Sequence, residues 1–94
     1  VDVVLWQDQI PVYAGARTLS EAGVASTLMP ANRRNAPVEG LDDPLLFDPQ
    51  TAGGLLAALP KKAAEKAVQA LNAAGLTGGI IGEVLQGTGH VTLK

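Results

Sequence analysis

The chain has 94 residues and a formal net charge of −2, a length that suits a single domain over residues 1–94. It has no cysteine and one histidine, which excludes disulfides, a thiolate nucleophile and cysteine- or histidine-based metal centres. A slightly acidic charge with 3% aromatic residues argues against a nucleic-acid partner, and no apolar stretch approaches the ~20 residues of a membrane span.

The first residues lack an initiator methionine, a basic segment and a signal-peptide core. We therefore expect the chain to be cut from something longer. The absence of cysteine is compatible with the cytoplasm, where we expect the protein to act. As a self-contained enzyme, the chain is poorly equipped.

The first half predicts two strands, one helix and one irregular segment. Residues 1–6 alternate and are rich in β-branched side chains, which indicates a strand. Apolar residues recur at helical spacing over residues 12–22, and Gly23 stands where a left-handed cap would end that helix. A short second strand is predicted over residues 24–29, before an irregular segment over residues 31–43.

The second half predicts four strands and the clearest helix. Residues 45–47 and 54–59 are short apolar runs separated by a loop that opens with Asp-Pro, a turn-forming pair. Residues 60–74 carry an apolar face at helical spacing, with a proline suited to the first turn. Residues 79–85 and 90–93 alternate around a glycine-rich turn, which predicts a terminal hairpin.

These elements predict an α+β domain. Helices interleave with strands, but the short connections between the late strands favour antiparallel pairing, because a parallel return needs a crossover of about a dozen residues. The economical arrangement is a single, mostly antiparallel or mixed sheet with helices packed on it, partly ferredoxin-like.

Residues 45–56, Leu-Leu-Phe-Asp-Pro-Gln-Thr-Ala-Gly-Gly-Leu-Leu, form the most unusual segment. Adjacent glycines let a ligand approach the backbone closely and can aim N–H groups at an anion. The segment lacks the Gly-Lys-Ser/Thr ending of a Walker A loop. On the residues alone, a tight turn capped by Asp48 and an anion-binding loop are both open, and the turn is favoured.

Residues 48–56 resemble the Asp-Pro-Gln-Thr-Ser-Gly-Gly-Leu-Leu signature of the selenophosphate synthetases (selenide, water dikinases). The resemblance extends over essentially the whole chain, through a Gly-Ala helix upstream and an Ile-Gly-Glu-Val strand downstream. The matching positions outside the signature are Pro11, Gly15, Ala16, Leu19, Gly23, Ser26, Thr27, Asn32 and residues 80–84. Ala52 stands where serine is usual, which puts a contact through that side chain in doubt.

The resemblance implies an ATP-dependent enzyme that uses magnesium to convert selenide, ATP and water into selenophosphate, AMP and phosphate. It also implies the superfamily of aminoimidazole ribonucleotide synthetase, with an N-terminal ATP-binding, dimer-forming domain and an α+β C-terminal domain. This chain resembles most of the C-terminal domain. Its expected partners are therefore the N-terminal ATP-binding domain of the same polypeptide and, through it, a homodimer.

By the same resemblance, the chain alone is expected to be inactive and to bind neither ATP nor magnesium tightly. It supplies no catalytic residue and no metal ligand, but shapes a cleft in which the glycine amides approach a phosphate. The implied site residues are Asn32, Asp48, Gln50, Thr51, Gly53 and Gly54.

Other polar features have simpler interpretations. Arg33 and Arg34 could attract phosphate, but two loop arginines are more typically solvated. Four acidic residues could bind magnesium, but the Asp-Asp pair before Pro44 favours a solvated turn. His90 is interpreted as a surface residue and Trp6 as half-buried. The acidic residues are Glu39, Asp42, Asp43 and Asp48.

Two alternative functions stay open. A small domain of this kind can be a non-catalytic regulatory or dimerisation module that uses a sheet edge or a helix face, and exposed apolar area would fit that role. The chain could also come from another ATP-dependent synthetase or kinase of the same superfamily, against which the Asp-Pro-Gln-Thr stretch speaks.

Overall fold

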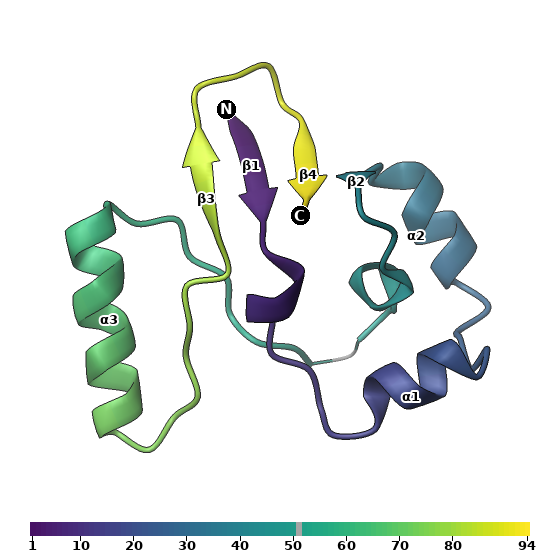
Figure 1. The fold of residues 1–94 in the computed structure, drawn as a ribbon, viewed down its shortest axis with the longest axis horizontal. Coiled ribbons are helices and arrows are strands. Elements are labelled where there is room, and N and C mark those ends of the chain that lie inside the picture. Colours follow the sequence, from purple (N-terminus) through teal and green to yellow (C-terminus); the bar gives the residue numbers. More distant parts are fainter. Residues whose placement is uncertain (51) are drawn as a thin grey trace.

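A computed structural model describes residues 1–50 and 52–94 of the chain (Figure 1). Short strands and helices alternate around one central sheet. In chain order the elements are β1 (Asp2–Leu5), the 3-10 helix η1 (Gln7–Gln9), α1 (Ala16–Glu21), α2 (Met29–Asn35), β2 (Glu39–Gly40), the 3-10 helix η2 (Pro44–Phe47), α3 (Lys61–Ala73), β3 (Gly82–Leu85) and β4 (Val91–Leu93).

The sheet is mixed and has the strand order β2-β4-β1-β3. β1 pairs antiparallel with β3, with Val3 opposite Val84, and parallel with β4, with Val3 opposite Val91. β2 pairs parallel with β4. The α+β class with a single mixed sheet is therefore confirmed.

The predicted terminal hairpin is wrong, because β1 lies between β3 and β4 (Figure 1). The Asp2 carboxylate accepts hydrogen bonds from the amides of Gly89 and His90, at 2.9 and 3.0 Å, and so holds the start of β1 against the connecting turn. A parallel pair of strands requires a long connection, and most of the chain lies between β1 and β4.

Three predicted strands are also absent from the described residues. Residues 45–47 form η2, since Asp43 caps its first amide and Pro44 pre-sets its first turn. Residues 24–28 precede α2, and Met29 is its first residue. The first turn of α2 contains Pro30, so this proline lies at the start of a helix where we expected it to end a strand. Residues 54–59 form no strand, because none of the described strands pairs with them. α2 and β2 lie in the segment predicted to be irregular.

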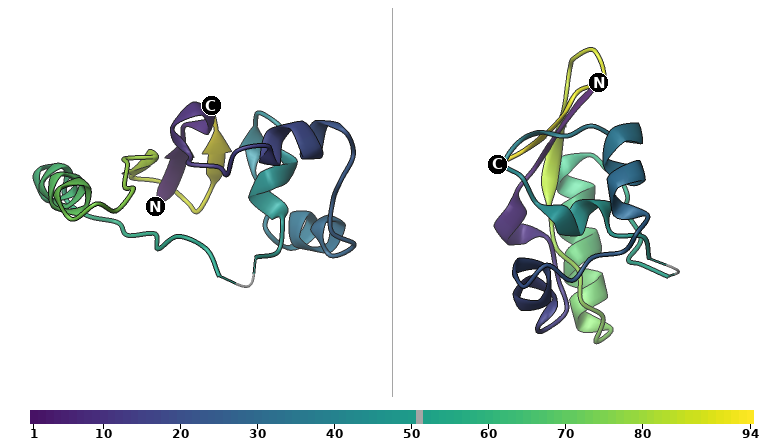
Figure 2. Two further views of the ribbon diagram at one scale, coloured as in Figure 1. Left: turned by 90° about the horizontal axis from the view of Figure 1, so that it is seen from below. Right: turned by 90° about the vertical axis from the view of Figure 1, so that its right-hand side faces the viewer.

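The two predicted helices are present as α1 and α3, and Gly23 and Gly75 follow them with φ of 85° and 75°. These left-handed conformations end each helix as its glycine predicts. α3 lies on one side of the sheet, beyond β3, whereas α1, α2 and η2 lie on the other (Figures 1 and 2). There, α1 and α2 both pack on η2.

The buried apolar core is small. Its members among the described residues are Val4 on β1, Leu93 on β4 and Phe47 on η2, each 7% exposed or less. Trp6 is half-buried, as predicted. Two of the three core residues thus lie on the central strands, and the third lies on η2, the element that leads directly into the signature at Asp48.

Candidate functional site

The signature begins where η2 ends and continues along the surface. Asp48, Gln50, Gly53 and Gly54 are all exposed, and the implied site residue Thr51 lies outside the described residues. Among the described residues, no backbone amide from position 50 to position 59 donates to another backbone group. Within the described residues, these amides therefore have no backbone partner.

The two signature glycines are not required by this chain's own conformation. Neither has a positive φ, so each could carry a side chain without backbone strain. A Cβ atom on Gly53 would meet the Gln50 Oε1 atom at 3.3 Å, and one on Gly54 would meet no described atom within 4 Å. Space is therefore left open on the outer side of Gly54, where a ligand could approach its amide.

Asn32 lies beside the start of the signature. It belongs to α2, and its Nδ2 atom donates a hydrogen bond of 3.0 Å to the carbonyl oxygen of Phe47, the residue before Asp48. The structure therefore brings together two implied site positions that are 16 residues apart. In this arrangement the Asn32 amide holds the end of η2.

Arg33 is more firmly held than a solvated loop arginine. Its guanidinium carbon lies 5.1 Å from the centre of the Phe47 ring, a cation–π geometry. It also forms an ion pair with the Asp42 carboxylate, and the two side chains are 41% and 70% exposed. The interpretation of Arg33 as simply solvated is therefore wrong, because it covers one face of the core aromatic residue.

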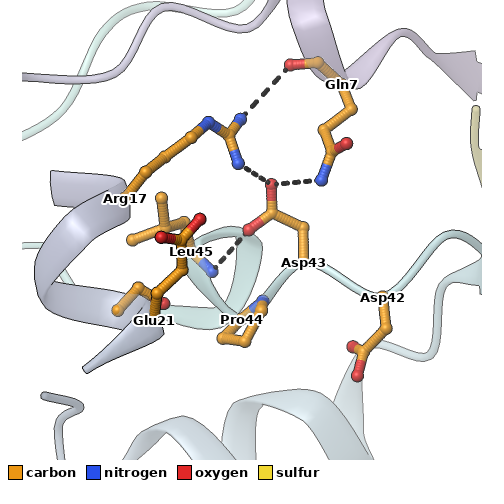
Figure 3. Close-up of a pocket in the computed structure, with 8 residues that line it drawn as sticks. Gln7, Arg17, Glu21, Asp42, Asp43, Pro44 and Leu45 are labelled. Atoms are coloured by element: carbon orange, nitrogen blue, oxygen red, sulfur yellow. Dashed lines mark hydrogen bonds and ion pairs between the residues drawn. The ribbon is translucent and has the colours of Figure 1, made fainter. Parts of the chain in front are cut away.

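Asp43 is the one buried charged residue among those described, with 5% of its surface exposed. Its Oδ2 atom accepts hydrogen bonds from Gln7 Nε2 at 3.0 Å and from Arg17 Nη1 at 2.9 Å, and its Oδ1 atom accepts from the Leu45 amide at 3.0 Å (Figure 3). The prediction that Asp43 lies in a solvated turn is wrong. Of the Asp-Asp pair, Asp42 is the exposed residue.

Charge pairing decides the ionisation of Asp43. Burial alone would raise the pKa of its carboxyl, but the hydrogen bonds from Gln7, Arg17 and Leu45 outweigh it and lower that pKa below its ordinary value. Asp43 is therefore an ionised, fully paired group. Sequence reasoning missed it, since only the cap on η2 is local, while Gln7 and Arg17 come from remote segments.

Two small cavities lie near this region, and neither is lined by a described residue of the signature. One, of about 150 Å³, lies between α1 and η2 and is lined by polar groups that include Arg17, Glu21 and Asp43 (Figure 3). The other, of about 300 Å³, lies between Arg33 and the segment after α2. Neither cavity therefore opens on Gly53 or Gly54.

His90 is a surface residue, as predicted. Its Nδ1 atom lies 2.7 Å from Glu39 Oε1 on the neighbouring edge strand β2, and both side chains are more than half exposed. The hydrogen bond that the His90 ring donates to Glu39, followed by the negative charges of Glu39 and Asp2, raises the pKa of His90. Over the part of the chain that is described, no group of three or more histidine, aspartate or glutamate side chains is placed to hold a metal ion.

Comparison with known proteins relates the chain to one enzyme family. It is 40% identical over 88 residues to the selenide, water dikinase of Myxococcus xanthus, 39% over 87 residues to that of Bdellovibrio bacteriovorus, and 33% over 90 residues to one from Desulfitobacterium hafniense. These matches cover 85%, 82% and 88% of this chain, respectively, but only 25%, 24% and 26% of the relatives.

No family model and no solved structure matches the chain. Each helix in the described part is too short or too polar to cross a membrane. The predicted resemblance is nonetheless confirmed by the curated relatives. The chain is homologous to a segment that makes up about a quarter of the length of selenide, water dikinases.

Proposed function

We propose that this chain is the C-terminal domain of an ATP-dependent selenophosphate synthetase and forms one wall of its active cleft. The reaction is the one implied by the resemblance: selenide, ATP and water give selenophosphate, AMP and phosphate. The relatives named selenide, water dikinase support this assignment. In the proposal, residues 1–94 act as one domain that contributes no nucleophile and is inactive alone.

The observation that carries the proposal is the pair of exposed amides at Gly53 and Gly54, which donate to no other backbone group among the residues that the structure describes. Adjacent N–H groups without internal partners can stabilise the negative charge of a phosphate at no cost in lost backbone pairing. Open space beside Gly54 leaves room for that approach. We assign Asp48, Gln50 and Asn32 to the same phosphate-facing region. We include Thr51 on the resemblance alone.

Magnesium fits this chain poorly. No described cluster of carboxylates is placed to hold it, and the best-ordered carboxylate, Asp43, uses its oxygens on Gln7, Arg17 and Leu45. We therefore assign the chain no metal ligand and no step through the metal. In the proposal, this wall of the cleft contacts the phosphate chain of ATP.

A partner surface is part of the proposal. The folded chain exposes 7214 Å², whereas a folded monomer of this mass exposes about 5,100 Å². Its radius of gyration is 14.5 Å, against about 12.4 Å for a compact domain of this length. The excess area supports a covering protein surface, which we assign to the ATP-binding domain of the same polypeptide within a cytoplasmic homodimer.

The test is a chimera in which this chain replaces the matching segment of the Myxococcus xanthus relative. With selenide and ATP as substrates, we expect selenophosphate and AMP to form. A Gly54→Val substitution keeps the amide but fills the open space beside it, so kcat/KM for ATP should fall by about a hundred- to a thousandfold, the range for losing one preorganised donor. Gly79→Val is the matched control, because Gly79 also has an ordinary φ, and a Cβ atom there would meet no described atom within 4 Å.

Two results would contradict the proposal. A chimera that folds but forms no selenophosphate would remove the assignment to this enzyme family's reaction. A chimera in which the Gly54 and Gly79 variants turn over equally well would leave the family relationship but remove the role of the glycine loop.

A non-catalytic assembly module is the second candidate. The outer edge of β3 is open in the described sheet, and Leu55 and Leu56 are 104% and 78% exposed. Both features suit docking of another chain. Under this alternative, substitutions on the β3 edge would disrupt assembly, whereas those at Gly53 and Gly54 would leave turnover unchanged.

A further inference from the structure

A partly buried polar cluster, Gln7–Arg17–Asp43, joins three segments that are distant in the sequence. Gln7 follows β1, Arg17 lies on α1 and Asp43 immediately precedes η2 (Figure 3). Arg17 also reaches the carbonyl oxygen of Gln7 through its Nη2 atom, at 3.5 Å. The cluster therefore ties the sheet and α1 to the beginning of η2.

The same cluster determines where η2 lies. Asp43 Oδ1 accepts from the Leu45 amide at the start of η2, and Asn32 donates to the Phe47 carbonyl oxygen at its end. η2 is thus held at its start by the side chain of its own cap, Asp43, and at its end by Asn32 of α2. The Asp48 amide at the start of the signature donates to the Leu45 carbonyl oxygen of η2 at 3.3 Å, and from residue 50 to residue 59 no described amide donates to another described backbone group. The direction in which the signature leaves η2 is therefore set at Asp48.

We propose that Asp43 is a positioning residue for the signature. Its ionised carboxylate fixes η2 against Arg17 and Gln7, and η2 in turn sets the position of the Gly53 and Gly54 amides relative to the phosphate that they approach. This inference rests on the proposed function, because it deepens the role of that same loop. Burial and charge pairing make the anchor stiff, since removing one partner leaves a buried charge unpaired.

The experiment uses the chimera described above with Asp43→Asn. This variant keeps an oxygen that can cap Leu45 but loses the charge that holds Arg17 and Gln7. We expect kcat to fall by about ten- to a hundredfold, the cost of a misplacement of about 1 Å, while KM for ATP changes less than about twofold. Asp42→Asn is the matched control, because its carboxylate is exposed and, among the described residues, pairs with Arg33 alone.

A second pair of variants keeps the inference testable if Asp43→Asn does not fold. Gln7→Ala removes one neutral hydrogen bond to Asp43 Oδ2, and Arg17→Lys keeps a cation but not the two-nitrogen contact. Each should reduce kcat less than Asp43→Asn, and their effects should not add when combined, because both act through one carboxylate.

Hydrogen exchange separates this inference from the proposed function. In Asp43→Asn, we expect faster exchange in peptides covering residues 44–56 than in the Asp42→Asn control, whether or not the chimera is active. Unchanged exchange there, or an unchanged kcat for the folded fraction of an active chimera, would overturn the positioning role. An inactive parent chimera with faster exchange in the variant would instead contradict only the proposed reaction.

Discussion

Gly40 is a position where a side chain has no room. It has a φ of 89° on the edge strand β2, and a Cβ atom there would collide with the carbonyl oxygen of Leu93. Gly40→Ala should cost about 1–2 kcal/mol for the left-handed backbone and a further 1–3 kcal/mol or so for the displaced strand. Gly15→Ala, with φ of 84° and open space around it, should show only the first cost. Urea unfolding of both variants checks this, and equal losses would contradict the proposed collision.

His90 makes stability depend on pH. Its raised pKa means that the folded state favours the protonated ring, through Glu39 and, more weakly, Asp2. This stabilisation is fully present below the unfolded value of 6.5 and is lost as the pH rises through the raised folded pKa. The free energy of unfolding should therefore decrease over that window, by an amount limited by solvent exposure.

An NMR titration of the His90 ring provides the measurement. Glu39→Gln should move its pKa back toward 6.5 and flatten the pH dependence of unfolding, while Glu65→Gln on α3 should do neither. A His90 pKa that stays the same in the Glu39 variant would show that the contact between the two side chains does not persist in solution.

Adjacent residues show what a single sequence can and cannot predict about a site. Asp42 and Asp43 are chemically identical, and the sequence predicts one solvated turn for both, yet one is exposed and the other is buried among three donors. The signature itself can be recognised in the sequence. The anchor of that signature cannot, because its partners Gln7 and Arg17 meet Asp43 only after the chain has folded.

At the scale of elements, the sequence correctly predicted features that depend on neighbouring residues alone. A proline at the start and a glycine at the end bracket α3, and β-branched alternation identifies β1. Strand partners and short apolar runs were harder to predict. Residues 45–47 are apolar like a strand but follow an Asp-Pro cap that begins a 3-10 helix, and the hairpin prediction could not include β1, which enters from the other end of the chain.

The central position of β1 has a measurable consequence. Val4 lies between two neighbouring strands and is 6% exposed, whereas Val84 on β3 is 51% exposed. Val4→Ala should lower the free energy of unfolding by about 1.5–2.5 kcal/mol, from lost burial and the residual cavity. Val84→Ala removes the same two methyl groups and should cost less than about 1 kcal/mol. Similar losses in a urea titration would contradict the insertion of β1 between β3 and β4.

At the scale of the whole molecule, the distribution of apolar side chains is uneven. The described core has three buried apolar residues, while several leucines stay exposed at the end of the signature, before α3 and on or after that helix, namely Leu55, Leu56, Leu59, Leu71 and Leu76. A chain with 47% hydrophobic residues would normally bury more of them. This distribution of apolar side chains is what our proposal expects of a domain that packs against another protein surface.

Leu55 and Leu56 allow this to be tested, because the same change can be measured in two settings. In the isolated chain their side chains are exposed, so replacing both with serine should change the free energy of unfolding by less than about 0.5 kcal/mol. In the Myxococcus xanthus chimera, a covering domain would bury them, and each serine should then cost about 1.5–3 kcal/mol. Equal effects in the two settings would mean that Leu55 and Leu56, at the end of the signature, stay uncovered in the chimera. The cleft would then have to be closed from another side.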